Sequence, residues 1–453
     1  MAWFDEAVFY HIYPLGLTGA PKVNDYGEPV HRLLTLTPWI GHIRELGCSA
    51  LYIGPLFESV GHGYETTDYR KLDTRLGTNE DLKAFVEECH RQGIRVVLDG
   101  VFNHTGRDFF AFRDLQKNRE NSPYRDWYSN VNFWGNNEYN DGFSYDNWGG
   151  FNLLVRLNQR NPAVKEYLCD VVRFWAKEFD RAGIRLDAAD VLDFGFMQDL
   201  RRTADSVKED FWLMGEVIHG EYIRWIRDAG LHSVTNYHLH KALWSGHNDH
   251  NYFEIAHTVK RLLDMAGGDP NRMKLYNFAD NHDVERIMTR LKNKEHFLPV
   301  QILLYTLPGI PSVYYGSEFG IEGRKERGSD DSLRPCLNLD ECRNDPEMAA
   351  RCRVISGLGR LHQDTPALSC GTYRELLLTT GHFAFERELD GCRVLVTVNN
   401  EDREKQLDLS AGNAAAFRGV LSGAVVKAEN GRVRLPVGAD SGEVWLPEEA
   451  PKS

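Results

Sequence analysis

Short apolar runs alternate with helix-like stretches along the first hundred residues of the chain. Runs with the length and content of buried strands occupy residues 7–13, 50–53 and 94–98. Stretches with apolar residues at helical spacing occupy residues 33–46 and 79–92, and each is followed by a glycine, Gly47 or Gly93. Strands that alternate with amphipathic helices predict a parallel sheet wrapped by helices.

The same alternation returns after residue 160 and continues to about residue 315. Asn161 and Pro162 are typical of the start of a helix, which is predicted to run to Phe179. Further helices are predicted over residues 194–209 and 251–265, and further strands over residues 183–186, 211–216, 233–236, 275–279 and 310–315. Eight strands separated by helices predict an α/β protein built as a closed (β/α)8 TIM barrel.

Two parts of the chain break this rhythm. Residues 105–157 have no clear period and are rich in Asn, Gly, Tyr, Trp and Phe, which favours a short inserted subdomain over a structureless loop. After residue 366 the chain consists of short strand-like runs separated by turns, which is typical of an all-β module. We therefore expect a barrel made of residues 1–104 and 158–365, an inserted subdomain at 105–157, and a C-terminal antiparallel β-sandwich at 366–453.

Composition and charge exclude several classes of partner. The 453 residues carry a net charge of −13, which argues against binding to nucleic acid. The first six residues have neither a basic nor an apolar segment of a signal peptide. Polar Gln301 and two prolines interrupt the most apolar stretch, 300–315, so no membrane span is expected. The eight scattered cysteines are typical of free thiols in a reducing cytoplasm, and the oligomeric state stays open.

Three acidic residues follow three of the predicted strands. Asp187 ends the run 183–187, Glu216 ends the run 211–216, and Asp283 ends the run 277–283. The carboxyl ends of parallel strands meet at one edge of a sheet, so the three side chains are expected in one site. Arg185 lies two residues before Asp187, on the same side of the strand, and we expect its charge to hold that carboxyl ionised.

Four short motifs extend this pattern in a fixed order along the chain. They read DGVFNH at 99–104, GIRLD at 183–187, GEV at 215–217 and NHD at 281–283. Together they resemble the alpha-amylase family of retaining glycoside hydrolases and transglycosylases. The pattern is nearest to the neopullulanase and cyclomaltodextrinase branch of that family, without the N-terminal domain that is usual there.

The resemblance implies a role for each matching residue. Asp187 is expected to be the nucleophile, Glu216 the general acid and base, and Asp283 a third carboxylate that binds sugar hydroxyls. Two carboxyls about 5–5.5 Å apart, one ionised and one protonated, suit such a retaining mechanism. The residues expected to bind substrate are Tyr64, Asp99, His104, Arg185, His282 and Arg334.

Two departures from the family pattern concern the surroundings of these residues. The neopullulanase branch tends to read Met-Pro-Lys-Leu-Asn where this chain has LVRLN at 154–158, so a proline is lost while Arg156 keeps the positive charge. Asp190 and Val191 stand where many extracellular relatives have Lys-His, so binding of the leaving sugars is expected to differ. The short, aromatic inserted segment is expected to wall a pocket that favours oligosaccharides over polymeric starch.

Metal binding is the less favoured interpretation of two further groups of residues. The histidines at 238, 240, 247 and 250 include a His-x-His pair, but they lack the accompanying ligands of a zinc motif. Asn103 matches a position that ligates calcium in many members of the resembled family. The inserted segment adds Asp108, Asp114 and Asp126 as oxygen donors, which leaves a structural calcium ion open although no cofactor is expected to be required.

The sequence therefore predicts a retaining glycoside hydrolase. It is expected to cleave α-glucosidic bonds, mainly α-1,4, in malto-oligosaccharides, cyclodextrins or related α-glucans by double displacement. One alternative is an α-glucan transglycosylase that uses the same covalent intermediate, and a remote one is a non-catalytic carbohydrate-binding paralogue. The sequence does not choose between α-1,4 and α-1,6 bonds or between substrate lengths.

Overall fold

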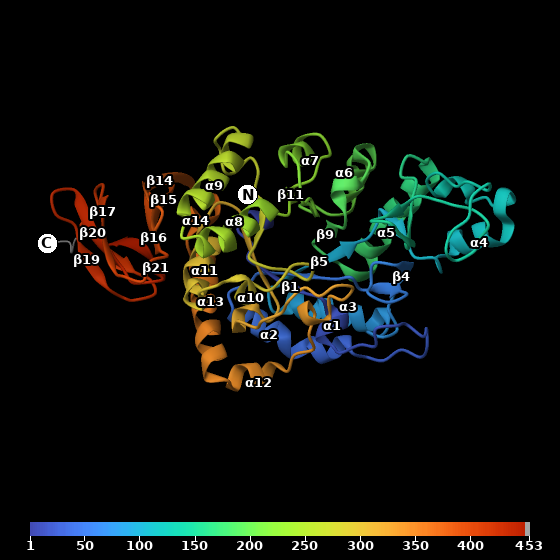
Figure 1. Cartoon of the computed structure of the whole chain (residues 1–453), viewed down its shortest axis with the longest axis horizontal. Coiled ribbons are helices and arrows are strands. Elements are labelled where there is room, and N and C mark those ends of the chain that lie inside the picture. The colour runs from blue at the N-terminus through green and yellow to red at the C-terminus, as the bar shows by residue number, and fades with distance from the viewer. Residues whose placement is uncertain (449–453) are drawn as a thin grey trace.

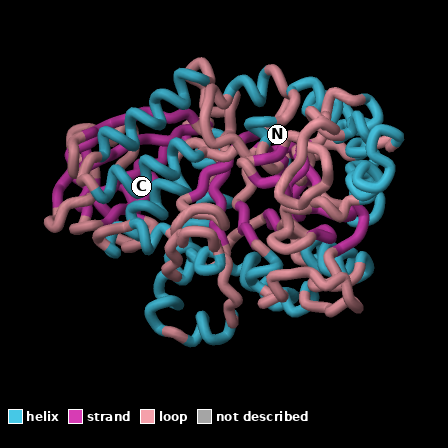
Figure 2. The backbone as a smooth tube through the Cα atoms, turned by 45° about the vertical axis from the view of Figure 1, so that its right-hand side comes forward, coloured by secondary structure: helices cyan, strands magenta, loops and turns pink. Residues whose placement is uncertain are grey.

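The computed structural model describes residues 1–448, and its elements fall into three groups (Figure 1). A barrel of strands and helices lies in the middle. A β-rich region formed by the end of the chain lies on one side of it, and the segment around α4 (Phe110–Asn118) lies on the opposite side. Strands occupy the centre of the barrel, with helices around them (Figure 2). Within residues 1–448, no helix is long and apolar enough to cross a membrane.

Eight parallel strands form the barrel, as the sequence predicts. Their order around the sheet is β11, β10, β9, β5, β2, β1, β13, β12. A parallel bridge between Thr235 and Tyr276 joins the two ends of this order and closes the barrel. The strands are β1 (Phe9–Ile12), β2 (Ala50–Ile53), β5 (Arg95–Gly100), β9 (Gly183–Leu186), β10 (Trp212–Gly215), β11 (Ser233–Val234), β12 (Tyr276–Phe278) and β13 (Ile310–Tyr314).

The barrel helices begin at residues suited to that position. Thr78 caps α3 by accepting a hydrogen bond from the Asp81 backbone N–H, and Asn161 caps α5 in a similar way, with Pro162 at its first position. The larger helices are α2 (Thr37–Glu45), α3 (Asn79–Arg91), α5 (Pro162–Phe179), α6 (Phe194–Val207), α8 (Tyr237–Asn248), α9 (Tyr252–Met265), α11 (Phe297–Thr306) and α13 (Pro346–Asp364). Shorter ones are α1 (Pro14–Leu17), α7 (Ile223–Arg227), α10 (Ile287–Arg290), α12 (Leu339–Asn344) and α14 (Pro366–Cys370).

The segment between β5 and α5 has a small sheet of its own. Strand β8 (Phe151–Arg156) pairs with β6 (His104–Thr105) on one side and with β7 (Asn147–Trp148) on the other. Helix α4 buries Phe112 and Leu115, and the Phe112 ring packs edge-on against Tyr128 and Tyr145 of the same segment. We propose to treat residues 105–157 as an inserted unit on this basis. A separate hairpin, β3 (Phe57–Ser59) and β4 (Thr66–Leu72), follows β2.

The C-terminal region is the antiparallel β-structure that its short strand-like runs predict. One sheet has the order β14, β15, β16, β21, β18, β19, and β17 pairs with β20 in a second sheet. Side chains of both sheets meet in one apolar cluster that includes Leu395, Leu407, Phe417 and Trp445. The strands are β14 (Thr372–Leu378), β15 (His382–Leu389), β16 (Cys392–Asn399), β17 (Lys405–Ser410), β18 (Ala416–Gly419), β19 (Val425–Lys427), β20 (Arg432–Val437) and β21 (Ser441–Glu448).

Helix α8 follows β11 closely and is an element that the sequence analysis did not predict. The side chain of Asn236 caps the helix by accepting from the Leu239 N–H. Two of the clustered histidines turn their Nδ1 atoms to backbone carbonyl oxygens, His240 to that of Ala279 and His247 to that of Leu243. The histidine-rich stretch is therefore a helix, and two of its imidazole rings are hydrogen-bonded to backbone carbonyl oxygens.

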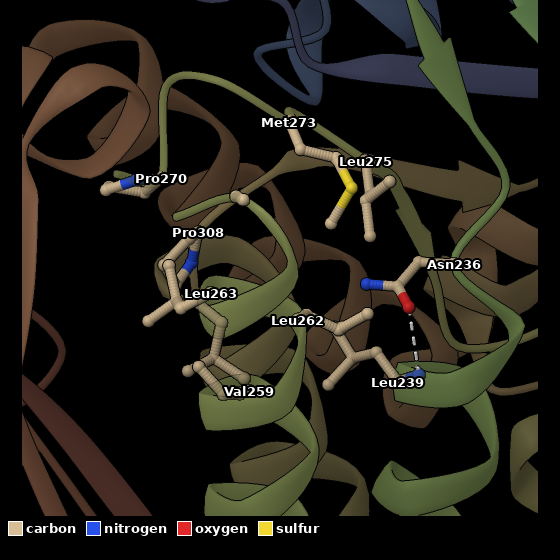
Figure 3. Close-up of a pocket in the computed structure, with 11 residues that line it drawn as sticks. Asn236, Leu239, Val259, Leu262, Leu263, Pro270, Met273, Leu275 and Pro308 are labelled. Carbon is tan, nitrogen blue, oxygen red and sulfur yellow. Dashed lines mark hydrogen bonds between the residues drawn. The ribbon is translucent and has the colours of Figure 1, made fainter. Parts of the chain in front are cut away.

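The barrel closes with few backbone contacts between β11 and β12. Strand β11 has only two residues, and side chains add to the single bridge. Ser233 Oγ donates to the Lys274 carbonyl at 2.7 Å, and Asn236 Nδ2 donates to Asn277 Oδ1 at 2.8 Å. A mostly apolar hollow lies beside this junction, between α8, α9 and the segment around Pro308 (Figure 3).

Candidate active site

One buried guanidinium connects three carboxylates at the carboxyl end of the barrel. Arg185, on β9, places Nη1 2.9 Å from Asp187 Oδ1 and 3.1 Å from Asp99 Oδ1. Its Nη2 lies 3.1 Å from Glu216 Oε2. Asp187 and Glu216 follow neighbouring strands, and the Glu216 N–H donates to the Leu186 carbonyl at the same level of the sheet. The sheet register therefore brings the predicted nucleophile and acid to one cation.

The backbone after Asp187 adds a second connection to Glu216. Ala188 has a φ of 47°, in the left-handed region that residues other than glycine seldom adopt. In this conformation its N–H donates to Glu216 Oε2 at 3.0 Å. Backbone strain of this kind costs about 1–3 kcal/mol and is commonly found at functional sites. Here it fixes the loop of the nucleophile against the carboxyl of the acid.

Burial changes the proton equilibrium of this carboxyl pair. Burial, followed by the negative charge of Glu216, raises the pKa of Asp187 well above its usual range, against the opposing charge of Arg185. Burial also raises the pKa of Glu216, and Arg185 again opposes the change. The expectation that Arg185 by itself keeps Asp187 ionised is therefore too simple, because its charge is shared with Asp99 and Glu216. The two carboxyls are expected to titrate as a pair that retains one proton.

The surroundings of Asp283 lower its pKa, whereas those of Asp187 and Glu216 raise theirs. Its Oδ1 lies 2.8 Å from Arg334 Nη2, and its Oδ2 lies 3.2 Å from His282 Nε2. The Lys325 ammonium donates to the Asp283 backbone carbonyl. Burial alone would raise the pKa of Asp283, but His282, Arg334, Arg185 and Lys325 together lower it below its usual range. This carboxylate is therefore charged throughout the pH range in which the pair titrates.

Aromatic side chains form a compact layer between Asp99 and Asp283. The Tyr64 hydroxyl lies 2.6 Å from His282 Nε2 and 3.1 Å from Asp99 Oδ2, and its ring stacks on His282. His104 places Nε2 3.0 Å from the Tyr64 carbonyl oxygen. Burial lowers the pKa of both His104 and His282 to about 3, so both rings are neutral at physiological pH. A neutral imidazole donates from one nitrogen and accepts at the other, and both nitrogens of His104 are occupied by the Tyr64 carbonyl and the Asn103 amide.

The expected substrate-binding residues thus divide into two groups. Asp99 has a fully buried side chain that accepts from Tyr52, Tyr64 and Arg185, so it supports other residues and is not accessible to a sugar. Arg185 is equally enclosed, with 3% of its side chain exposed. Asp187, Glu216 and Asp283 keep part of their carboxyls exposed. We propose that direct sugar contact belongs to this second group, together with Tyr64 and Arg334, whereas His104 and His282, each 1% exposed, position these residues.

Sequence reasoning missed Tyr237, which lies beside the predicted acid. The first residue of α8 directs its hydroxyl to Glu216 Oε1 at 3.4 Å, and the hydroxyl oxygen accepts from Asn281 Nδ2 at 3.1 Å. Its place immediately after the sixth barrel strand was the available signal, because barrel active sites form from residues after the strands. Tyr52 and Lys325 were missed as well, since each lies in a motif with no recognisable chemistry.

The described residues offer little support for a metal ion. No group of three or more His, Cys, Asp or Glu side chains in residues 1–448 is arranged to hold one. Asn103 Oδ1 is buried without a hydrogen-bond partner among those residues, as a vacant ligand would be. The three aspartates expected to join it bind elsewhere: Asp108 pairs with Arg113, Asp114 accepts from Ser122, and Asp126 pairs with Arg125. The residues present therefore do not fit a calcium site built from these aspartates.

Comparison with known proteins agrees with the fold. Residues 33–352 match the family described as alpha amylase, catalytic domain. A cyclomaltodextrinase of Bacillus sp is 32% identical over 424 residues, which cover 88% of this chain and 74% of that protein. A maltogenic alpha-amylase of Bacillus acidopullulyticus is 29% identical over 88% of this chain and 68% of that protein.

Solved structures extend the similarity to the whole chain. A structure of a cyclomaltodextrinase superposes with a TM-score of 0.86 at 28% identity, covering 98% of this chain and 78% of that one. A protein of Thermus thermophilus superposes with a TM-score of 0.84 at 28% identity, covering 99% of this chain and 100% of that one. The parallel barrel, the carboxylates at its carboxyl end and these matches together identify the chain as a glycosidase. The chain belongs to the alpha-amylase family.

Proposed function

We propose that this enzyme hydrolyses α-1,4-glucosidic bonds of short malto-oligosaccharides and cyclodextrins with retention of anomeric configuration. The observation that carries the proposal is the contact of one arginine with both Asp187 and Glu216, opposite the charged Asp283. Relatives named cyclomaltodextrinase, maltogenic alpha-amylase and neopullulanase support the substrate class.

The proposed reaction uses the shared proton of the carboxyl pair. Asp187 Oδ1 accepts from Arg185, which leaves the Oδ2 atom of the same carboxyl to attack the anomeric carbon. Glu216 donates the proton to the glycosidic oxygen as the bond to the leaving sugar breaks, and a covalent glycosyl-enzyme results. Glu216, now ionised, removes a proton from water, and the hydroxide oxygen displaces Asp187 from the sugar. The separation of about 5–5.5 Å between the two carboxyls that this scheme requires stays a prediction.

The protonation states in the site suit these roles. A raised pKa keeps a proton on the pair near neutral pH, where a general acid needs it. Charge develops on the sugar ring in the transition state, which resembles an oxocarbenium ion. The permanent negative charge of Asp283 and the partial charge of Asp187 favour that cation.

Product analysis tests this function directly. Purified enzyme would be incubated with β-cyclodextrin, maltotriose, pullulan, panose and soluble starch, and the initial anomers followed by NMR. We expect fast cleavage of cyclodextrin and maltotriose, slower cleavage of starch, and α-anomers as the first products. Initial β-anomers would exclude retention, and inactivity on all five glucans would exclude the function.

Transfer of the glycosyl group to a second sugar is the alternative outcome of the same intermediate. Val191 and Ile218 are exposed aliphatic side chains that closely follow Asp187 and Glu216 in the sequence. An apolar surface at this place favours a sugar ring over water as the acceptor. Products longer than maltotriose in the maltotriose digest would assign the enzyme to transfer, while glucose and maltose alone would assign it to hydrolysis.

We further propose that the enzyme acts in the cytoplasm. All eight cysteines are free, and three of them, Cys48, Cys89 and Cys169, are buried among barrel helices and strands. Thiols in this number are usual in reducing compartments. A relative named intracellular maltogenic amylase, from Bacillus subtilis, is 28% identical over 84% of this chain and 64% of its own length. Cell fractionation with an antibody against the chain would test the location.

A further inference from the structure

A buried lysine faces a buried cysteine where the barrel meets the C-terminal region. Lys274 lies two residues before β12, between Met273 and Leu275, which line the apolar hollow of Figure 3. Cys370 is the last residue of α14. The Lys274 ammonium donates to Cys370 Sγ at 3.2 Å, although 96 positions separate the two residues in the chain. The pair therefore brings the segment before β12 into contact with the start of the C-terminal β-structure.

Side chains of the barrel hold the backbone of both residues in place. Asn271 Nδ2 donates to the Cys370 carbonyl at 2.9 Å, and Ser233 Oγ donates to the Lys274 carbonyl at 2.7 Å. The last turn of α14 adds a hydrogen bond from the Gly371 N–H to the Ala367 carbonyl at 3.0 Å. The fold itself therefore keeps the lysine nitrogen and the cysteine sulfur at contact distance.

Two cations lie next to the Cys370 thiol. Lys274 is one of them, with 8% of its side chain exposed. The other is the buried Arg387, whose guanidinium donates to the carbonyls of Leu368 and Gly371, on either side of the cysteine. Burial lowers the pKa of Arg387 to about 10, and the nearby Cys370 sulfur opposes this change. Cations beside a thiol favour the thiolate, which is the nucleophilic form of cysteine.

An anchoring role of Lys274 does not account for its contact with the thiol. The ammonium also donates to the Asp5 carbonyl at 3.2 Å, which holds the beginning of the chain against the barrel. A buried ammonium is normally paired with a carboxylate. Here the Asp5 carboxylate oxygen lies 3.5 Å away, farther than the Cys370 sulfur. A thiolate at Cys370 is therefore a nearer counter-ion of Lys274 than the carboxylate is.

We propose that Cys370 and Lys274 form a redox-sensitive crosslink, in which hydrogen peroxide oxidises the thiol and the lysine amine captures it as a sulfenamide. In the first step the thiolate sulfur attacks peroxide and the O–O bond breaks. The released hydroxide takes a proton from the Lys274 ammonium and becomes water, which leaves a sulfenic acid beside a neutral amine.

The second step joins the two side chains. The Lys274 nitrogen attacks the sulfur of the sulfenic acid and the S–O bond breaks. The departing hydroxide takes a proton from the same nitrogen and becomes a second water. The sulfur is oxidised by two electrons, and one peroxide is reduced to two waters. Lys274 is thus first the proton donor and then the nucleophile.

The crosslink is reversible by thiols. A small thiol attacks the sulfur of the S–N bond, which releases the Lys274 amine and leaves a mixed disulfide that a second thiol reduces to Cys370. In the crosslinked state α14 is tied covalently to the segment beside the junction of β11 and β12. The proposal makes no use of a substrate, so it is independent of the proposed function.

Peptide mapping of the peroxide-treated protein tests the crosslink. The full chain would be treated with hydrogen peroxide, cleared of peroxide with catalase, alkylated with N-ethylmaleimide and digested with trypsin. We expect a linked pair of peptides that contains Lys274 and Cys370, with the mass of the two peptides less two hydrogen atoms. Dithiothreitol before alkylation should abolish the pair and restore both peptides.

Lys274→Arg separates capture from oxidation. It keeps a positive charge beside the thiol, but a guanidinium stays protonated and does not attack the sulfur. Cys370 should then give a sulfenic acid that dimedone labels, without a crosslink. Cys370→Ser should remove both products. Cys392→Ser is the matched control, because Cys392 is an exposed thiol of the C-terminal β-structure and its removal should leave the crosslink unchanged.

Three outcomes in the wild type would overturn the proposal, so the decision does not depend on the folding of a variant. One is a free Cys370 thiol under conditions that oxidise the exposed Cys392. A second is oxidation of Cys370 to a sulfinic or sulfonic acid while Lys274 stays unmodified. A third is a linked pair that is heavier by one oxygen atom, which would indicate an S–O–N bridge in place of the S–N bond.

Discussion

The Tyr237 hydroxyl lies 3.4 Å from Oε1 of Glu216, and Asn281 donates to the same hydroxyl. Because Asn281 Oδ1 also accepts from the backbone N–H of Asp283, a chain of hydrogen bonds joins the loop of the third carboxylate to the general acid. The hydroxyl proton of Tyr237 points to Glu216, where it stabilises the ionised carboxyl.

Tyr237→Phe should move the alkaline limb of the pH profile. Loss of the donor removes a contact that favours ionised Glu216, so the pKa of the acid rises and the limb moves to higher pH. A long hydrogen bond of about 0.5–1 kcal/mol corresponds to roughly 0.4–0.7 pH units. The measurement is kcat/KM for maltotriose between about pH 5 and 9. Tyr373→Phe, which removes a hydroxyl of β14 that has no hydrogen-bond partner among the described residues, is the control. An equal limb in wild type and Tyr237→Phe would contradict the contact.

Arg334→Ala should impair the enzyme most strongly at low pH. Arg334 helps to hold the pKa of Asp283 below its usual range, so without it that pKa rises and Asp283 becomes protonated as the pH falls. We expect kcat/KM to fall by about 10²-fold near neutral pH and further below about pH 5. Arg327→Ala, which removes an exposed charge from the same loop, should leave the profile unchanged. A uniform loss at all pH values would argue against a role through Asp283.

Substitution of the two central carboxyls should separate nucleophile from acid. Asp187→Asn should lower kcat by about 10⁴-fold or more on every substrate, because an amide does not attack the anomeric carbon. Glu216→Gln should lower it by about 10²–10⁴-fold on maltotriose, and by less than about tenfold on α-maltosyl fluoride, whose leaving group needs no proton. The two assignments would be exchanged if Asp187→Asn retained activity on the fluoride and Glu216→Gln did not.

His247 should make the protein less stable in acid. Burial lowers the pKa of this histidine to about 3, below the value of about 6.5 expected in the unfolded chain. Its contribution to stability is therefore complete above about pH 6.5 and is lost as the pH falls towards about 3, by up to about 1.4 kcal/mol per pH unit. His247→Gln should reduce that slope by about one proton in denaturant titrations between about pH 4 and 7. The same change at exposed His257 should leave the slope unaltered.

The barrel was predictable because its apolar runs are short and regularly spaced. Strands such as β2 and β9 begin within one residue of the predicted run, and the glycines and Asn-Pro pair mark the helix ends. Helix α8 was not predicted because it carries several histidines. The spacing of these residues does not reveal their hydrogen bonds to backbone carbonyl oxygens. The sheet of the inserted segment was not predicted because β6 and β7 have only two residues each, too few to show a strand pattern.

The site was predictable to the extent that it follows strands. Asp187, Glu216 and Asp283 each come within a few residues of a barrel strand, so their convergence follows from the topology. The sharing of Arg185 among three carboxylates depends on side-chain burial, and for that reason the raised pKa of Asp187 could not be foreseen. Prediction of Tyr237 as a site residue required the exact end of β11, which is the shortest strand of the barrel.

The short junction between β11 and β12 has a consequence for the internal motions of the enzyme. One backbone bridge and two side-chain hydrogen bonds join these two strands, and an apolar hollow lies beside them. The junction therefore resists opening less than the strand pairs with longer hydrogen-bond ladders elsewhere in the barrel. Backbone amides of residues 233–236 should therefore exchange with deuterium earlier than those of β2 or β5. Tyr237 follows this junction directly, so each such opening would carry the phenol away from Glu216, and a bound sugar that spans the site would slow the exchange.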